Sequence, residues 1–251
     1  MRLTLIRNAT ILLEHGSATL LVDPMLADAG ANPPIPDTAP PLANPLVGLP
    51  RPAADIAAAA THALVTHLHR DHFDETAQAL LRDDLPIACA PEHAGGVRDA
   101  GFADVTLIEQ RAAFAGFDVA RVAARHALDE HEGPLGPVSG YVLRADGAPV
   151  VHVASDSRWC PELAAAISAQ EPDVIVVNAG AARFTTGGPI SMTAEYVIAV
   201  ARHAPGALVV AVHLEALNHC PLTRDALART LVAAAVDDRV VIPADGETLA
   251  L

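Results

Sequence analysis

The sequence predicts an α/β protein, in the α+β sense, whose two mixed β-sheets are flanked by helices. The 251 residues are 51% hydrophobic but only 3% aromatic, so the core must rest on Ala, Val, Leu and Ile, which favours layered α/β packing. Strand-like runs outnumber helical patterns, and many neighbouring strands are spaced like hairpins rather than in strict βαβ alternation. We see no short internal repeat and expect one domain over residues 1–251.

The first 22 residues predict a β-meander. Residues 2–7, 10–14 and 18–22 alternate or cluster β-forming side chains, and a His-Gly-Ser turn separates the last two runs. The next stretch, residues 28–54, holds eight of the twenty prolines, which excludes a regular helix or a central strand. A loop of this length in a compact domain is usually functional or mobile. We interpret it as a lid or wall near a site, with a surface decoration as the alternative.

The remaining elements follow in mixed order. A short helix ends at residues 57–60, and residues 63–66 form a short buried strand. Helical patterns then lie at residues 74–82, 92–100, 160–170, 192–203 and 223–235. Strand-like runs lie between them, at residues 86–90, 104–108, 117–124, 138–144, 149–154, 173–178, 207–213 and 239–242.

Charge and cysteine content narrow the class of partner and compartment. The net charge of −14, without a run of Lys or Arg, argues against nucleic acid and favours a small-molecule substrate. The three cysteines are odd in number and lack C-x-x-C spacing, so we expect a reducing cytoplasmic location and no disulfide framework. Charged and polar residues interrupt the apolar N-terminus, and no apolar run reaches the length of a membrane span. The apolar composition also permits a homo-oligomer.

The strongest chemical signal is the segment from residue 63 to residue 75, ALVTHLHRDHFDE. Its apolar strand leads into His67 and His69, which alternation near a strand end places on one side, where both can approach one metal. Asp71 and His72 follow after the chain turns, and can face a second cation in the same pocket. Imidazole suits zinc, iron, manganese and nickel, and no thiolate is present to require zinc. The alternative is a helix start that is rich in histidine and binds no metal. Without a metal, so many titratable groups at a strand end would cost stability unless something neutralised them.

This H-x-H-x-D-H pattern after a strand resembles the signature of the metallo-β-lactamase superfamily. The resemblance extends over nearly the whole chain, through the opening hairpins up to Asp-Pro and through the segments GAPVVHVASDS and GALVVAVHLEA. Within the superfamily, the pattern is most similar to the lactonase-like branch that includes ascorbate phosphate lactonase and the N-acylphosphatidylethanolamine phospholipases. The resemblance implies a four-layer αβ/βα sandwich with the site along one edge of the paired sheets.

The resemblance also implies a ligand set for two divalent metal ions, expected to be zinc, with manganese or iron as alternatives. The first ion would be held by three histidines, the second by one aspartate and two histidines, and a further aspartate would bridge them: His67, His69 and His126; Asp71, His72 and His213; Asp156. Asp23 would lie beneath and hydrogen-bond a ligand. His131 and His219 are the alternatives to His126 and His213. Ser155 departs from the glycine that usually precedes the bridging aspartate, which puts the local geometry in doubt.

Four further residues are candidates for the substrate pocket: Asn8, Asn178, Arg183 and His219. Arg183 would be able to hold an anionic group in a loop shaped by Gly and Pro, although a surface arginine is an equal alternative. For Asn8 a structural hydrogen bond is the alternative to a pocket role. Asn218 and Cys220, beside His219, are expected either to line the pocket or to have structural roles. The other histidines outside the motif are interpreted as surface or core residues: His15, His62, His93, His152 and His203.

The function that this resemblance implies is metal-dependent hydrolysis, in which Asp71 would act as the catalytic residue that orients the attacking hydroxide. The substrate would be a small-molecule ester, lactone or phosphodiester, because the acidic surface disfavours polynucleotides. The fold alone does not choose among substrates. The alternatives are a di-iron redox protein of the same fold, a nuclease of the superfamily, and a non-catalytic metal-binding or ligand-sensing module.

Overall fold

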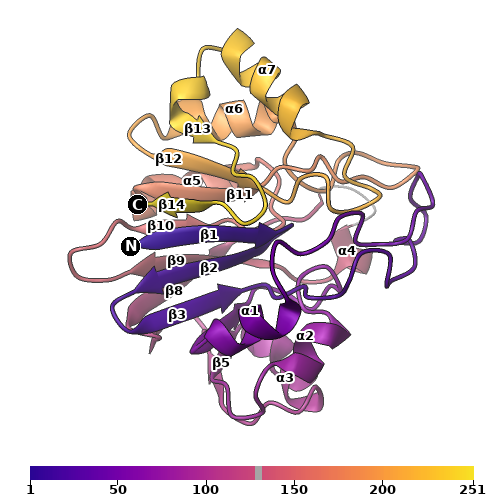
Figure 1. The fold of residues 1–251 in the computed structure, drawn as a ribbon. Coiled ribbons are helices and arrows are strands. Elements are labelled where there is room, and N and C mark those ends of the chain that lie inside the picture. The colour runs from indigo at the N-terminus through magenta and orange to yellow at the C-terminus, as the bar shows by residue number, and fades with distance from the viewer. Residues whose placement is uncertain (128–131) are drawn as a thin grey trace.

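Two seven-stranded β-sheets packed face to face organise the computed structural model, which describes residues 1–127 and 132–251 (Figure 1). The first sheet has the order β14 (Thr248–Ala250), β1 (Arg2–Arg7), β2 (Thr10–His15), β3 (Ala18–Val22), β4 (His62–Val65), β5 (Ile87–Cys89) and β6 (Val105–Leu107). The second has the order β13 (Val240–Val241), β12 (Leu208–Val212), β11 (Val174–Asn178), β10 (Val151–Val153), β9 (Ser139–Arg144), β8 (Phe117–Ala123) and β7 (Arg111–Phe114).

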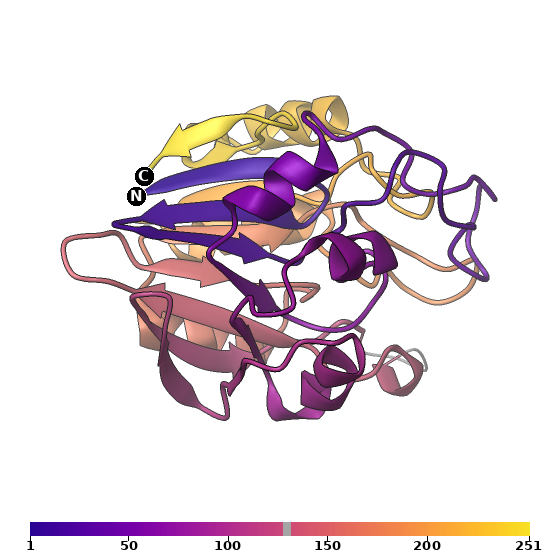
Figure 2. The same cartoon turned by 60° about the horizontal axis from the view of Figure 1, so that its bottom comes forward.

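Helices cover the outer face of each sheet, which confirms the predicted four-layer αβ/βα sandwich (Figures 1 and 2). The first sheet carries α1 (Ala53–Ala59), α2 (Glu75–Leu80) and, after the short 3-10 helix Pro91–His93, α3 (Ala94–Asp99). The second sheet carries α5 (Pro161–Gln170), α6 (Ala194–His203) and α7 (Arg224–Ala233). A one-turn helix, α4 (Glu132–Leu135), precedes β9, and a second 3-10 helix, Asp237–Arg239, precedes β13.

Strand alternation directs the apolar side chains of each strand either into the core between the sheets or under the outer helices. Along β10, Val151 and Val153 point into the core between the sheets, whereas residue 152 points toward the helices. Leu3 and Leu5 of β1 likewise face the other sheet, and Ile6 packs under the outer helices. Each such fully buried aliphatic side chain contributes about 1.5–3 kcal/mol relative to an exposed one, so these layers fix the positions of the strands.

The strand directions bring several strand ends to one edge of the sandwich. β3 to β6 run parallel, as do β10 to β13, and β8 has the direction of β10 because both are antiparallel to β9. The carboxyl ends of β4, β8, β10 and β12 therefore meet at the same edge. The candidate ligands predicted from the sequence follow these four ends.

Several elements differ from the sequence prediction. β7, β14 and α4 were not predicted, and the helix expected over residues 92–100 divides into a 3-10 turn and α3. The hairpin between β7 and β8 turns at Ala115 and Gly116, both with positive φ (53° and 78°), a turn for which Ala-Gly is a weak sequence signal. β14 pairs with β1 over residues nearly the whole chain apart, so the two termini lie side by side (Figure 1).

The proline-rich segment of residues 28–54 is anchored at both sides of the edge where the strands end. The buried guanidinium of Arg7 donates to the carbonyl oxygens of Met25, Ala27 and Val47, at 2.9–3.0 Å. The segment then runs beside the loops that follow β11 and β12 (Figures 1 and 2), where Asp37 O accepts from Thr185 N at 2.8 Å. Within the described residues, no helix combines the length and the apolar character that crossing a bilayer requires.

His152 is an imidazole sealed in the core without a hydrogen bond. The side chain is fully buried on β10, and neither ring nitrogen has a partner. Gly140 of the neighbouring β9 makes room for it, because a Cβ there would lie 3.2 Å from Nε2. Burial lowers the pKa of His152 from 6.5 to about 4. The side chain is therefore neutral at pH 7.

We expect the His152→Leu variant to lose less stability in acid than the wild-type protein. Because the folded pKa is the lower one, the unfolded chain takes up a proton first, and stability is lost as pH falls from 6.5 toward 4. At about 1.4 kcal/mol per pKa unit, the wild-type protein should lose about 3 kcal/mol more. Urea denaturation of metal-free protein at several pH values measures this, with the exposed His203→Leu as control. Equal pH dependence in His152→Leu and wild type would contradict the assignment.

Candidate metal centre

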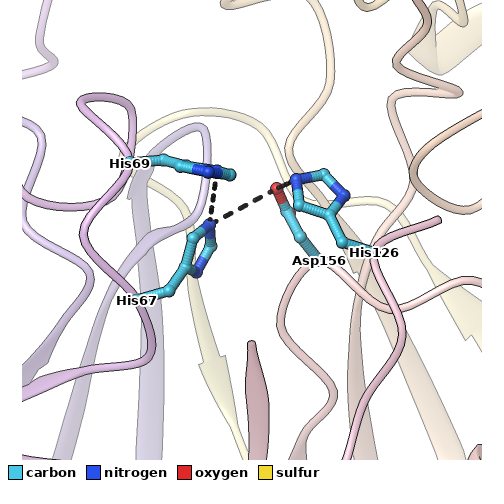
Figure 3. Close-up of side chains that lie close together, drawn as sticks. All are labelled: His67, His69, His126 and Asp156. Carbon is cyan, nitrogen blue, oxygen red and sulfur yellow. Dashed lines mark hydrogen bonds and ion pairs between the residues drawn. The ribbon is translucent and has the colours of Figure 1, made fainter. Parts of the chain in front are cut away.

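Seven side chains from four strand ends converge at the edge of the sandwich. They form two groups, and in each group the potential ligand atoms all lie within 4.8 Å of one another: His67, His69, His126 and Asp156; Asp71, His72, Asp156 and His213. Asp156 belongs to both. Figure 3 shows the first group, in which the imidazoles of His67, His69 and His126 and the carboxylate of Asp156 point toward one another. Both groups are buried or nearly so.

Asp156 lies at the centre of the cluster. Its Oδ2 is 3.2 Å from Nε2 of His72, 3.2 Å from Nε2 of His126 and 3.8 Å from Nε2 of His67. Its Oδ1 is 3.7 Å from Nε2 of His213. One carboxylate thus contacts histidines of both groups, which is the position that a ligand shared by two cations requires.

Two of the histidines are fixed by main-chain carbonyl groups. Nδ1 of His126 lies 2.6 Å from Ile190 O, and Nε2 of His69 lies 2.9 Å from Leu135 O. A carbonyl oxygen only accepts, so each of these nitrogens carries a proton. The other nitrogen of each ring therefore presents a lone pair to the cluster. Orientation of a metal-binding imidazole by a bond to its far nitrogen is the usual arrangement in metal sites.

Asp23 and Thr66 fix two more histidines from below. Asp23 Oδ2 accepts from Nδ1 of His72 at 2.8 Å, as the sequence analysis expected for a residue beneath the site. Thr66 bonds Asp23 through its backbone N and its hydroxyl, both at 2.8 Å, and its hydroxyl lies 2.9 Å from Nδ1 of His67. The fifth histidine, His213, places Nδ1 3.5 Å from the thiol of Cys220.

The donor set fits divalent cations. Nε2 of His72 is buried and lacks a hydrogen bond, although Asp156 lies close, because the approach does not have hydrogen-bonding geometry. A buried polar atom without a partner calls for an explanation such as an absent ion. Five imidazoles with their far nitrogens occupied and two carboxylates form a nitrogen and oxygen set suited to zinc, manganese or iron.

The buried carboxylates of the cluster are stabilised by positive charge close to them. Burial opposes the charged form of His72, yet the carboxylates of Asp156, Asp23 and Asp71 raise its pKa well above 6.5. The pKa of Asp156 lies well below its ordinary value despite burial, because His72 and His213 are close. The pKa of Asp71 is lowered in the same way. In the metal-free protein, protons on histidine therefore supply charge that cations would supply.

The predicted pocket residues Asn178 and Asn8 instead hold the cluster in place. Nδ2 of Asn178 donates to Asp156 Oδ1 at 2.6 Å. Nδ2 of Asn8 donates to the carbonyl oxygen of Asp71 at 2.9 Å, and the carbonyl oxygen of Asn8 accepts from His213 N at 2.8 Å. The structural alternative given for Asn8 therefore describes its contacts.

The other candidates lie apart from the two groups. Arg183 is exposed, and its Nε donates to Ala181 O rather than to a candidate ligand. His219 is buried beside Asp71 and His213, its Nδ1 has no hydrogen-bond partner, and burial lowers its pKa to about 4. It belongs to neither group, so His213 takes the position for which His219 was the alternative. His131 lies outside the described residues.

Asn218 ties the proline-rich segment to this edge. Its Nδ2 donates to Thr38 Oγ1 at 2.7 Å and to Pro40 O at 2.8 Å. Asn44 Nδ2 donates to Asn218 Oδ1 at 2.8 Å, and Asn218 N donates to Asn44 Oδ1 at 2.9 Å. Because Asn218 directly precedes His219, the segment is held next to the second group. These contacts favour the interpretation of residues 28–54 as a wall.

The contacts that Thr66, Asn218 and Cys220 make near the cluster were not predicted from the sequence. The position of Thr66 directly before the first histidine was a usable signal, since a hydroxyl there can reach both Asp23 and His67. Asn218 and Cys220 were candidates for the pocket beside His219, with structural roles as the alternative. The partners of Asn218 come from a distant part of the chain, residues 38–44, which pattern alone does not indicate.

Comparison with known proteins agrees with this geometry. Residues 19–214 match the family model described as the Beta-lactamase superfamily domain. The UPF0173 protein YddR of Bacillus subtilis is 33% identical over 251 residues, covering 99% of each chain. The crystal structure of isothiocyanate hydrolase from Delia radicum gut bacteria is similar with a TM-score of 0.95 and 33% identity, covering 100% of this chain and 99% of that one. A possible metal-dependent hydrolase from Veillonella parvula is similar with a TM-score of 0.96 and 28% identity over the same shares.

Proposed function

Because the chain belongs to the metallo-β-lactamase superfamily of metal-dependent hydrolases, we propose that it hydrolyses isothiocyanates at a pair of divalent metal ions. The observation that carries this proposal is the 33% identity to an isothiocyanate hydrolase over essentially the whole of both chains. The net reaction adds water across the N=C=S group and releases an amine and carbonyl sulfide. This substrate class replaces the phosphodiester considered from sequence, and an ester or lactone is the second candidate.

The surroundings of the cluster suit a neutral, apolar substrate. An apolar group packs beside the candidate ligands: Met25, Ala127, Ala182, Ile190, Leu217 and Cys220. Arg183, the cation that sequence reasoning offered for an anionic group, is exposed. Arg7 is turned toward the main-chain carbonyl groups of Met25, Ala27 and Val47. These contacts favour an uncharged electrophile over a phosphodiester.

Each group of ligands would hold one ion. The first would use His67, His69 and His126, the second Asp71, His72 and His213, with Asp156 shared. When bound, divalent cations lower the pKa of water and polarise the electrophilic carbon of the substrate.

Individual residues have separate tasks in this proposal. Asp71, a carboxylate at neutral pH, orients the attacking hydroxide. Asn178 keeps Asp156 in place through the 2.6 Å bond. His219, buried beside Asp71 and His213, stays neutral and adds no positive charge to the site.

We expect the metal-loaded protein to turn over benzyl isothiocyanate faster than p-nitrophenyl acetate, a γ-lactone or bis-p-nitrophenyl phosphate. Amine release measures the reaction, and turnover must exceed the stoichiometric thiol adducts that the three buried cysteines could form. Asp71→Asn should lower kcat by about 100-fold or more, because Asp71 is a candidate ligand and the loss of even an outer hydrogen-bond partner of a metal site costs about 10–100-fold in affinity or activity. The exposed Asp84→Asn serves as control and should leave kcat unchanged.

Each other outcome has a definite meaning. Turnover of the lactone or ester without the isothiocyanate would overturn the substrate class and keep the hydrolase. Metal binding without turnover of any of the four compounds would favour the sensing module. Elemental analysis and a visible spectrum on the same sample distinguish zinc or manganese from a di-iron redox site.

A further inference from the structure

The hydroxyl of Ser155 joins the two sheets directly beneath the candidate metal centre. Its Oγ donates to Thr66 Oγ1 at 2.8 Å. Ser155 follows β10 of the second sheet, and Thr66 follows β4 of the first. Ser155 is 1% exposed and Thr66 is fully buried. A hydrogen bond between two such groups is screened from water and holds its geometry.

Counting protons at Thr66 fixes the direction of every bond around it. Its single hydroxyl proton goes to Asp23 Oδ2, because a carboxylate only accepts. The Thr66 oxygen then has two lone pairs, and Ser155 Oγ donates to one. Nδ1 of His67, at 2.9 Å, must donate to the other. Nε2 of His67 is thereby left with its lone pair toward the cluster, where it faces the unprotonated Nδ1 of His69 at 3.0 Å, an arrangement that two ligands of one cation would have.

The two partners of this bond each stand next to a candidate ligand. Ser155 directly precedes Asp156, which both groups share, and Thr66 directly precedes His67. The carboxylate comes from the second sheet and His67 from the first. A bond between their neighbours therefore fixes the distance between the shared carboxylate and the histidines across the sheet interface.

The backbone at Ser155 adds an independent observation. Its φ is +56°, in the left-handed region that glycine adopts freely and residues with a Cβ adopt at a cost. Strain retained at a buried position beside a site motivates a hypothesis of function. A glycine would relieve the strain and would remove the hydroxyl.

We propose that Ser155 is a positioning residue of the metal centre, acting through Thr66 on His67 and through the chain on Asp156. The proposal rests on the proposed function insofar as the seven side chains bind metal. In this proposal the Ser155 hydroxyl aligns Asp156, on the second sheet, with His67, on the first. Thr66 passes this constraint on to His67, because its hydroxyl oxygen binds both Ser155 and His67.

The test compares Ser155→Gly with Ser155→Ala. Both remove the hydroxyl, but only the glycine relieves the strained backbone, so their stabilities should diverge while their metal affinities fall together. Loss of an outer hydrogen-bond partner typically weakens metal binding by about 10–100-fold, and we expect a loss of at least about 10-fold in zinc affinity. Chelator competition measures the dissociation constant, and the visible spectrum of the cobalt-substituted protein reports the ligand geometry.

Ser139→Ala is the matched control. Ser139 is as buried as Ser155, but it lies on β9 and its hydroxyl accepts from Arg121 Nε instead of joining the neighbours of two candidate ligands. Its loss should leave the zinc affinity within about twofold of wild type and the cobalt spectrum unchanged. If Ser139→Ala weakens binding as much as Ser155→Gly, the loss of any buried hydroxyl has the same effect and the proposal fails.

A double-mutant cycle with Thr66→Val tests the route. Once the Thr66 hydroxyl is gone, removing the Ser155 hydroxyl should cost no further affinity, so the two effects should be non-additive. Additive effects would overturn the role of Thr66. Wild-type affinity in Ser155→Gly would overturn the role of Ser155 while the metal site stands. A wild-type protein that binds no zinc, manganese or iron would overturn the proposed function itself.

Discussion

The Asp156→Asn variant should lose metal binding in both groups at once, and with it all measurable hydrolysis. The carboxylate lies 3.2 Å from both His72 and His126, which belong to different groups, and within the described part of the chain Asp156 alone belongs to both. Replacing it with an amide keeps the shape and removes the negative charge. Loss of an outer partner alone costs about 10–100-fold in metal affinity, so loss of a shared ligand should exceed about 100-fold. Elemental analysis after gel filtration should find less than one ion per chain.

Asn178 provides the graded comparison for this prediction. Asn178→Ala removes only the 2.6 Å bond that orients Asp156, and should weaken binding without abolishing it. The exposed Asp84→Asn should retain the wild-type metal content. A folded Asp156→Asn protein that keeps two ions and full turnover would refute the assignment of the shared carboxylate.

The part of the site that is local in sequence was the most predictable. His67, His69, Asp71 and His72 lie within six residues directly after β4, so their closeness follows from their proximity in the sequence. The more distant members, such as Asp156, followed from resemblance, and the structure brings them to the same cluster. The role of all seven as ligands stays a prediction.

The contacts that support the cluster were less predictable. The sequence suggested a pocket role for Asn178, which instead bonds Asp156 across two adjacent strand ends. Ser155 was a source of doubt about the local turn, and its hydroxyl bonds Thr66 of the other sheet. The first bond depends on the pairing of β10 with β11 and the second on how the two sheets pack, and a linear pattern contains neither distance.

The same distinction explains the fold. Apolar alternation over residues 2–7 and 18–22 predicted strands because the signal lies within each segment. β14 has only three residues, with the pattern exposed, intermediate, exposed, and exists because β1 offers it an unpaired edge. β7 is similarly half exposed and depends on pairing with β8. Short edge strands lack the buried face that makes a strand recognisable from sequence.

Removing the metal should lower the melting temperature by about 8–16 °C for each ion lost. A ligand that binds only the folded state stabilises it by about 4 kcal/mol at 1,000 times its dissociation constant. For a chain of this length, 1 kcal/mol shifts the melting temperature by about 2–4 °C. The cluster should respond strongly, because without cations Asp71 and Asp156 stay charged inside the protein and depend on protonated His72 and His213. Calorimetry before and after chelation, and after zinc is restored, measures the shift.

The change in melting temperature caused by zinc should depend on pH. The pKa values of His72 and His213 are raised in the metal-free protein, so both rings hold protons that an incoming cation must displace. Lowering the pH should therefore shrink the zinc-induced rise in melting temperature, and raising it should enlarge the rise until both rings are neutral. Asp156→Asn should show no zinc-induced rise at any pH, whereas the exposed His203→Leu should follow wild type. A rise that is independent of pH, or one that persists in Asp156→Asn, would mean that zinc binds elsewhere on the protein.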